Sequence, residues 1–518
     1  MLRSVLQQAD INKGADQVQQ SKPLAVTRGP AEKNPGEKSD MKFVKKPCLS
    51  YVSSTALKSR TTAKERVTLL AMLVTAFLLT SALVTQGQSP ARDPGPRTGT
   101  AGAGNNIAGL SANQLAYFND GLTRFQDVES VRNGKNNGLG PTFNSNSCSS
   151  CHAQPGVGGS SPAVNPQVQV ANDSGATNTI PPFITLNGPV REARLKFATS
   201  PDGSLTKVPD GGVHGLFTIA GRSDAAGCEM AQPNFQRMME ENNISFRIPT
   251  PTFGLGLVES ISEDTILGNL TAESALKGSL GIAGHPNRSG NDGSITRFGW
   301  KAQNKSIIVF AGEAYNVEMG VTNELFPNER GYPPHQIPAS CLFNQTPEDA
   351  TNFDVSTTTA VPSDVVAFSN FMRLLDQPAP SCTGANCSAS IQNGHRLFVD
   401  VAKCSLCHTP TMTTGSAYVP ALTNIDAHLF SDLLLHNMGS GLADGVSQGD
   451  AGPDEFRTAP LWGIGQRLFF LHDGRTSDLL HAIEAHQSQG SEANGVMRIF
   501  NNLTESQKQD ILNFLRSL

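Results

Sequence analysis

The sequence lacks the motifs of several large enzyme classes. Its 518 residues contain no Gly-x-x-x-x-Gly-Lys-Ser/Thr phosphate loop, no dinucleotide-binding glycine pattern after a strand, and no His-Glu-x-x-His zinc motif. Lysine and arginine form no long run and the formal net charge is −5, so we predict that the protein does not bind nucleic acid. Cysteine is also scarce, with nine residues, but four of them lie in two short motifs.

Both motifs have the form Cys-x-x-Cys-His. The first is Cys148-Ser-Ser-Cys151-His152, and the second is Cys404-Ser-Leu-Cys407-His408. In this pattern two thiols bond to the vinyl groups of a haem, and the adjoining histidine takes one axial position on the iron. A redox Cys-x-x-Cys needs no histidine there, and a zinc site needs a second pair of ligands nearby. The sequence therefore predicts two covalently attached c-type haems, with His152 and His408 as proximal iron ligands.

The N-terminal 88 residues predict a leader. Residues 1–65 are polar, and an apolar stretch at 67–84 follows several basic residues, which is the order of an export signal. The segment 66–88 is either cleaved near Gln86–Gln88 or kept as an anchor, because about 18 apolar residues just span a bilayer. Since 65 residues is long for a signal, we expect a later start, such as Met41. Residues 89–110 then predict a flexible linker.

The expected export to the periplasm favours disulfide bonds among the remaining cysteines. Cys228, Cys341, Cys382 and Cys387 lie outside the haem motifs, and an oxidising compartment favours their pairing. Cys382 and Cys387 enclose only Thr-Gly-Ala-Asn and are able to close a small loop. We predict at least one disulfide; the alternative is four free buried thiols.

Helical periodicity surrounds both haem motifs. Capping-box spacing at Ser111/Gln114 and at Thr504/Gln507 predicts helices over 111–125 and from 504 to the end of the chain. Apolar periodicity predicts further helices over 363–376 and 388–401.

The segment 153–335 has no sustained helical period. Short apolar runs between Gly, Pro, Asn and Asp clusters predict β-strands, at 168–170, 183–186, 215–219 and 306–310. Short helices are expected near 234–241 and 272–277. The fold class is therefore predicted to be mainly α. It would comprise two c-type cytochrome domains, 111–360 and 361–518, with a loop- and hairpin-rich insertion between the haem motifs.

Seven strings resemble a known family. They are Gly138–Asn144, Ser147–Pro155, Phe253–Ile261, Arg297–Lys301, Asp432–Gly439, Phe456–Gly463 and Phe470–Arg475. Together they resemble the di-haem oxidoreductases, formerly called thiol oxidoreductases, which are distant relatives of bacterial di-haem cytochrome c peroxidases. The resemblance covers about residues 110–518, and the strings near the C-terminus are the most specific.

This resemblance implies a function. In the peroxidases one haem stores and relays electrons, and the other binds hydrogen peroxide. We therefore expect an exported oxidoreductase with a peroxidase-like mechanism, which takes electrons from a small cytochrome or cupredoxin and acts on peroxide or on another small or protein substrate. Two alternatives stay open: an electron carrier with both irons six-coordinate, and a haem-dependent protein-modifying oxidase, like the relative that matures tryptophan tryptophylquinone in methylamine dehydrogenase.

The sixth ligand of the second haem is expected to be Met438, because a thioether raises the potential of an electron-storing haem. The alternative is a methionine that packs against the haem edge. His436 and His472 are rival ligands. The peroxidases carry their ligand just before the segment that matches Phe456-Arg-Thr-Ala-Pro460, a place that holds Asp454 and Glu455 here.

Peroxide cleavage also needs a group that moves a proton. Glu259 is the first candidate, with His486 and Glu492 ranked lower; otherwise Glu259 is a structural carboxylate bound to an arginine or to backbone. Arg475 is expected to pair with a haem propionate or a carboxylate. Trp300 and Trp462 either relay electrons between the haems or simply fill the core.

Overall fold

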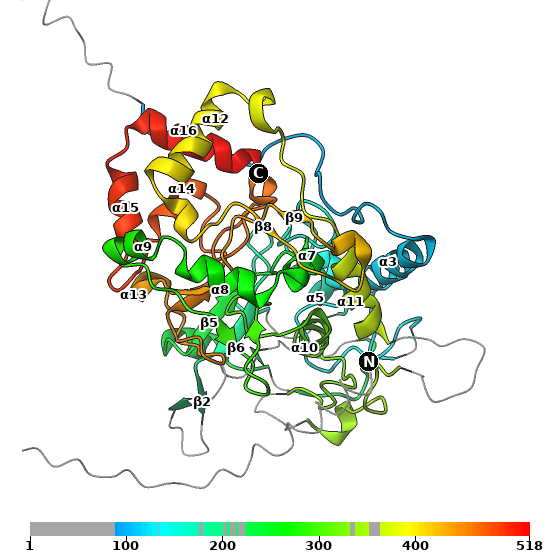
Figure 1. Ribbon diagram of the computed structural model, residues 1–518. Helices are drawn as coiled ribbons and strands as arrows, with labels where there is room; N and C mark the ends of the chain where they lie inside the picture. The colour runs from blue at the N-terminus through cyan, green and yellow to red at the C-terminus, as the bar shows by residue number, and fades with distance from the viewer. Residues whose placement is uncertain are drawn as a thin grey trace, which may run out of the picture. The chain divides into compact units, whose positions relative to one another are not determined.

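The structure is a computed structural model that describes residues 89–132, 134–175, 180–199, 205–207, 214–215, 223–230, 232–331, 337–351 and 363–518. Residues 89–518 form one compact unit that is mainly helical, with small hairpins between the helices (Figure 1). The predicted leader and the segment 66–88 lie outside the described residues. No helix of the described part has the length and apolar character needed to cross a bilayer.

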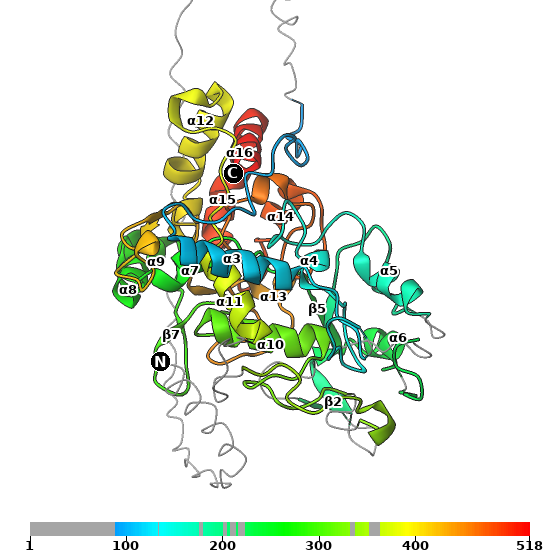
Figure 2. The ribbon, with the colours of Figure 1, turned by 90° about the vertical axis from the view of Figure 1, so that its right-hand side faces the viewer.

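Three helices form the core of the N-terminal half: α3 (Ala112–Phe125), α10 (Ile307–Met319) and α11 (Asp364–Leu374). They lie one above another in Figure 2, with α11 in contact with both partners. The ring of Phe371 centres 4.9 Å from that of Phe125. Gly121 allows this approach, because a Cβ atom there would lie 2.3 Å from the carbonyl oxygen of Ala367. The predicted capping box of α3 is present.

The other elements of this half are short. The helices are α4 (Cys148–Cys151), α5 (Pro166–Asp173), α6 (Phe235–Glu240), α7 (Leu255–Ser260), α8 (Glu263–Thr271), α9 (Ser274–Leu280) and the 3₁₀ turn Ala339–Cys341. Strand β1 (Glu192–Leu195) pairs antiparallel with β4 (His214–Gly215) and β5 (Ile244–Arg247), with Ala193 opposite Gly215 and Phe246. Two hairpins join β2 (Phe197–Thr199) with β3 (Leu205–Lys207), and β6 (Asn287–Arg288) with β7 (Ile295–Thr296).

Three of the four predicted strands are wrong, and the fourth is only partly described. Residues 168–170 lie in α5, and residues 306–310 begin α10, where the Ser306 side chain caps the first turn. Residues 183–186 form turns. In each case a short apolar run does not distinguish a strand from a buried helix or turn. Of the fourth run, Gly215 lies in β4 and 216–219 lie outside the described residues. Helices near 234–241 and 272–277 are confirmed as α6 and α9.

The C-terminal half packs around α12 (Ala389–Arg396) and α16 (Glu505–Ser517), which contact each other along their length (Figure 1). A π-helical turn, Leu397–Val401, continues α12 towards the second motif. Gly394 permits close contact, since a Cβ atom there would lie 2.0 Å from the carbonyl oxygen of Asp510. The capping box at Thr504 is present, so the predicted terminal helix is confirmed.

The remaining elements of this half build the walls around the second motif. They are the 3₁₀ turns Gly384–Asn386, Cys404–Leu406, Pro420–Leu422 and Ile464–Gln466, the helices α13 (Gly439–Leu442), α14 (Leu479–Glu484) and α15 (Asn494–Asn501), and the strand pairs β8 (Met412–Thr413) with β9 (Asp426–Ala427) and β10 (Leu435–Asn437) with β11 (Glu455–Arg457).

Two segments differ from the expected domain plan. Residues 89–110, expected as a flexible linker, pack on the C-terminal half through an ion pair of 2.5 Å between Asp93 and Arg516. Low hydrophobicity suggested a linker, but a buried charge pair orders the segment. Helix α11, expected in the second domain, contributes Phe368 and Phe371 to the buried cluster around α3 and α10. The same cluster also includes Met412 and Leu434, so it draws side chains from both halves of the chain.

Two disulfides are present. Cys228 bonds to Cys341, and Cys382 bonds to Cys387. The prediction of at least one disulfide is confirmed, and the cysteines of both Cys-x-x-Cys-His motifs take no part in a disulfide.

Candidate functional site

The first motif forms one short helix, α4, at the wall of a large cavity. His152 follows the helix, and its Nδ1 lies 3.0 Å from the carbonyl oxygen of Gly159. Burial lowers the pKa of His152 to about 4, so the imidazole is neutral, which is the form that binds iron. Burial also raises the pKa of Cys151 to about 12. A redox Cys-x-x-Cys lowers its thiol pKa instead, so this environment disfavours a thioredoxin-like role.

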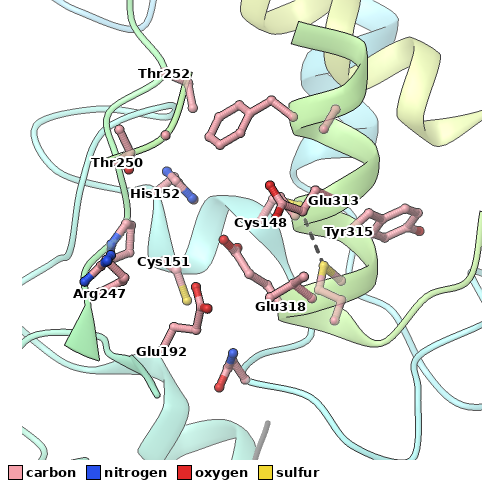
Figure 3. A pocket seen from close by; sticks show the side chains of 18 of the residues that line it. Cys148, Cys151, His152, Glu192, Arg247, Thr250, Thr252, Glu313, Tyr315 and Glu318 are labelled. Atoms are coloured by element: carbon pink, nitrogen blue, oxygen red, sulfur yellow. Dashed lines mark hydrogen bonds between the residues drawn. The ribbon is translucent and has the colours of Figure 1, made fainter. Parts of the chain in front are cut away.

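The cavity beside this motif has an empty volume of about 1160 Å³. Cys148, Cys151 and His152 line one side, and α10 faces them (Figure 3). Glu313 and Glu318 come from α10, and Glu192 comes from β1. Both motif cysteines therefore line the same cavity as these carboxyl groups.

Glu318 is the most perturbed carboxyl group of this cavity. Burial, with added repulsion from Glu192 and Glu313, raises its pKa to about 8. In Figure 3 its side chain extends into the space between the two motif cysteines. A carboxyl group with a pKa near neutrality is able to give or take a proton in the physiological range.

The second motif repeats the arrangement of the first. His408 follows the turn that carries Cys404 and Cys407, and its Nδ1 lies 3.0 Å from the carbonyl oxygen of Phe430. Burial lowers the pKa of His408 to about 4. The adjoining cavity has an empty volume of about 1450 Å³ and is lined mainly by apolar side chains from α14, α15 and α16.

The three candidates for the sixth iron ligand all line this second cavity, but their side chains make different contacts. His436 has both ring nitrogens engaged: Nδ1 lies 2.8 Å from Glu492, and Nε2 lies 2.9 Å from Asp432. The ring of His472 stacks on Phe456 with centroids 4.3 Å apart. Met438 lines the cavity and is held by a backbone hydrogen bond of 2.8 Å to Asp454. Ligation by Met438 stays a prediction.

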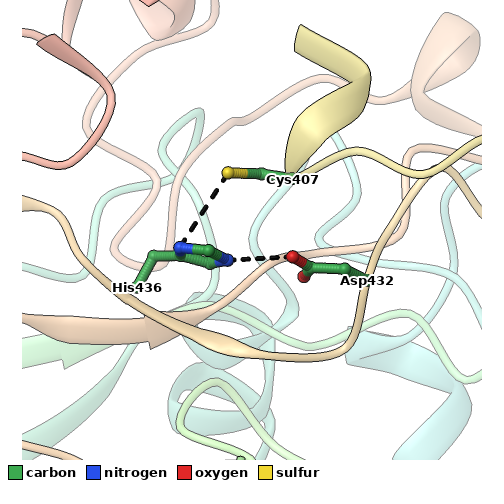
Figure 4. A group of neighbouring side chains, drawn as sticks. All are labelled: Cys407, Asp432 and His436. Carbon is green, nitrogen blue, oxygen red and sulfur yellow. Dashed lines mark hydrogen bonds and ion pairs between the residues drawn. The ribbon is translucent and has the colours of Figure 1, made fainter. Parts of the chain in front are cut away.

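The group around His436 also resembles a metal site. Ligand atoms of Cys407, Asp432 and His436 lie within 4.8 Å of one another (Figure 4). Burial lowers the pKa of His436, but Asp432 and Cys407 outweigh burial and raise it well above its usual value. Both ring nitrogens of His436 are engaged by carboxylates, and Cys407 belongs to the second motif, so we describe this group as a buried ion pair beside the motif cysteine.

Buried guanidinium groups indicate what the cavities are able to hold. In the second cavity, Nε and Nη2 of Arg467 are buried without a hydrogen-bond partner, and in the first cavity the same holds for Nη1 of Arg194. Buried polar groups rarely lack a partner, and guanidinium pairs best with a carboxylate. The carboxylates of a bound haem would satisfy both, so the residues of each cavity fit the predicted group.

Trp300 is shared by the two cavities. It lines both of them, and its Nε1 donates a hydrogen bond of 3.1 Å to the carbonyl oxygen of Ile248. Trp462 lines a smaller space that also includes Trp300 and Arg467. Of the two tryptophans, only Trp300 therefore contacts both candidate haem sites among the described residues.

The first-ranked proton-transfer candidate lies elsewhere. Glu259 does not line either large cavity, and its carboxylate accepts hydrogen bonds of 2.6 and 3.3 Å from Arg373. Arg475 pairs with Asp473 at 2.8 Å, which is the carboxylate alternative foreseen for it. Glu492 accepts hydrogen bonds from the backbone of Ala283 and Gly284 as well as from His436. The geometry thus favours Glu318 over Glu259 for proton transfer.

Glu318 is not among the candidates that the sequence predicts. The sequence predicts a strand at 306–310, whereas these residues begin the helix that carries Glu313 and Glu318. The serine N-cap at Ser306 followed by an apolar run was the available signal.

A comparison with protein-family models identifies the family of this chain. A family model described as "Di-haem oxidoreductase, putative peroxidase" matches residues 199–518, a range that includes the second motif and begins after the first. Among solved structures, hydrazine synthase from Kuenenia stuttgartiensis, pressurised with xenon, is similar at 18% identity over 31% of this chain and 56% of that chain, with a TM-score of 0.22. A MauG-like protein associated with microbial copper homeostasis is similar at 20% identity over 31% of this chain and 55% of that chain, with a TM-score of 0.23. The matches thus span about half the length of these solved chains. A search of curated proteins gave no match.

Proposed function

Because this chain belongs to the di-haem oxidoreductase family, we propose that it is an exported c-type oxidoreductase with one substrate haem and one electron-transfer haem. Cys148, Cys151 and His152 would hold the substrate haem, and Cys404, Cys407 and His408 the electron-transfer haem. When bound, the haems supply two iron centres that store electrons and reduce peroxide or oxidise another substrate. A small cytochrome or cupredoxin in the periplasm would deliver the electrons.

The observation that carries this proposal is the difference between the two cavities. Among the described residues that line the first cavity, His152 is the only histidine, and the ionisable carboxyl group of Glu318 faces it. The second cavity is apolar on most sides and contains several histidines. Proton transfer is needed where a substrate reacts, whereas an electron store needs a filled coordination sphere and little water.

Glu318 would act as the proton carrier. A carboxylate oxygen takes one proton from hydrogen peroxide and returns it to the leaving oxygen as the O–O bond breaks. With two electrons and two further protons, one hydrogen peroxide yields two water molecules. Because the carboxylate is the accepting form, the rate of peroxide reduction should rise with pH through the pKa of Glu318, about 8.

Trp300 supports the link between the cavities. Its indole lies at the wall of each, and the backbone hydrogen bond to Ile248 holds its orientation. An aromatic side chain at this position would divide electron transfer between the two haems into two shorter steps.

The test is peroxide reduction by Glu318→Gln. We expect turnover to fall about 10²-fold, the usual contribution of a positioned acid–base group, with both haem spectra retained and the rise with pH abolished. Glu329→Gln is the matched control, because burial also raises the pKa of Glu329 to about 8 but this residue lines neither large cavity.

Two outcomes would contradict the assignment. If Glu259→Gln loses turnover while Glu318→Gln keeps it, Glu259 rather than Glu318 is the proton carrier. If the half-reduced wild-type protein does not react with peroxide and both haems are six-coordinate in every redox state, the protein is an electron carrier.

A further inference from the structure

His486 lies close to His408 in the second cavity. The two imidazole rings centre 6.4 Å apart with their planes at 56°, and both residues line the cavity. The chain reaches this point just after α14, whose N-terminus is capped by Asp478 through hydrogen bonds of 2.8 and 3.1 Å. Ser491 then donates a hydrogen bond of 2.7 Å to the carbonyl oxygen of His486, so the histidine is held from both sides.

A hydrogen bond at one ring nitrogen of His486 determines which nitrogen is able to bind a metal. Nδ1 of His486 lies 2.9 Å from the carbonyl oxygen of Ala482. A carbonyl only accepts, so Nδ1 carries the proton and Nε2 keeps its lone pair. The two motif histidines, His152 and His408, show the same contact, at 3.0 Å each. Histidines that bind metals are commonly oriented in this way by a backbone carbonyl.

The spacing fits one metal ion between the two rings. An imidazole nitrogen lies about 2.0 Å from a bound transition metal and about 1.1 Å from its ring centre, so two opposed rings centre about 6.2 Å apart. The 6.4 Å between His408 and His486 agrees with this value. No comparable contact with His408 is present for the other two histidines among the residues that the structure describes: His436 is engaged by two carboxylates, and His472 stacks on Phe456.

We propose that Nε2 of His486 is the sixth ligand of the haem held by Cys404, Cys407 and His408. This inference rests on the proposed function, because it needs a haem at the second motif. A second imidazole fills the coordination sphere and excludes peroxide from that iron. It also replaces the thioether expected from Met438, which leaves the haem with a lower reduction potential than histidine–methionine ligation would give.

The test uses the purified two-haem protein and its electron paramagnetic resonance and near-infrared spectra in the oxidised state. The wild type should show one low-spin haem of bis-imidazole type, without a sulfur-to-iron charge-transfer band. His486→Gly should convert that one haem equivalent to high spin, and added imidazole should restore the low-spin signal. His486→Met should stay low-spin, gain the sulfur-to-iron band and raise the reduction potential of this haem.

The matched control is His481→Ala, an exposed histidine of α14 that does not line the cavity, and its spectra should equal those of the wild type. The inference is overturned if His486→Gly keeps the low-spin signal, or if Met438→Leu removes the signal in its place. Either result leaves the proposed function standing as long as two haems are bound. A protein with only one haem per chain would instead refute the proposed function itself.

Discussion

Single side chains near the first cavity carry unusual charge states. The hydroxyl group of Tyr315, on α10, lies 3.2 Å from a carboxylate oxygen of Glu129 and 3.2 Å from one of Asp364. Burial, with added repulsion from Asp364, raises the pKa of Glu129 to about 8. Glu129 therefore holds its proton in the folded protein at neutral pH, beside the tyrosine that forms part of the cavity wall.

This raised pKa predicts a pH-dependent stability. The pKa of Glu129 in the folded protein lies above the ordinary value of 4.5. The stability that depends on the protonation of Glu129 is therefore fully present below pH 4.5, and it is lost as the pH rises towards about 8. Glu129→Gln stays neutral and avoids this loss. The variant's free energy of unfolding minus that of the wild type should therefore increase by at least about 1 kcal/mol as the pH rises from about 5 to about 8.

Guanidinium denaturation followed by far-ultraviolet circular dichroism would measure this gain. Glu240→Gln removes a carboxylate at an exposed position of α6 and serves as the control. A difference between Glu129→Gln and wild type that stays constant with pH would show that Glu129 is ionised in the folded protein.

At the scale of elements, the two disulfides constrain very different lengths of chain. Cys228–Cys341 joins residues 113 positions apart, across the insertion and α10, whereas Cys382–Cys387 joins residues 5 positions apart before α12. The loss of chain entropy in the unfolded state grows with the length of the closed loop. The long bridge therefore restrains the unfolded state more strongly than the short one.

Removing each bridge should reveal this difference. We expect the double variant Cys228→Ala/Cys341→Ala to lose about 4 to 5 kcal/mol of unfolding free energy, and Cys382→Ala/Cys387→Ala about 2 kcal/mol. Denaturant unfolding of both variants under identical conditions gives the comparison. Equal losses would mean that local strain or packing, rather than loop closure, dominates the effect of the bridges.

At the scale of the whole molecule, two similar sites are built from separate parts of one chain. Each has a Cys-x-x-Cys-His motif, an adjoining cavity and a buried arginine with at least one guanidinium nitrogen that has no hydrogen-bond partner. Trp300 connects the sites, and the core of α3, α10 and α11 supports the first one. The expected content is two covalent haems per chain.

A pyridine haemochrome assay measures that content. The wild type should carry two haems per chain, and Cys404→Ser should weaken or abolish attachment at the second site while the first keeps its haem. Cys382→Ser changes a cysteine outside both motifs and should retain two. One haem per wild-type chain would be incompatible with two functional motifs.

Short-range spacing in the sequence was sufficient for the haem motifs, the capping boxes of α3 and α16, the mainly helical class and the family. These features depend on residues within a few positions of each other, where covalent geometry and local hydrogen bonds dominate. Only the tertiary structure decided which side chains line the cavity beside each motif. Glu318 lies 166 positions after His152, and His486 lies 78 positions after His408 (318 − 152 and 486 − 408). Local pattern carries no information on such pairs, because the packing of distant helices brings them together and burial then sets their charge.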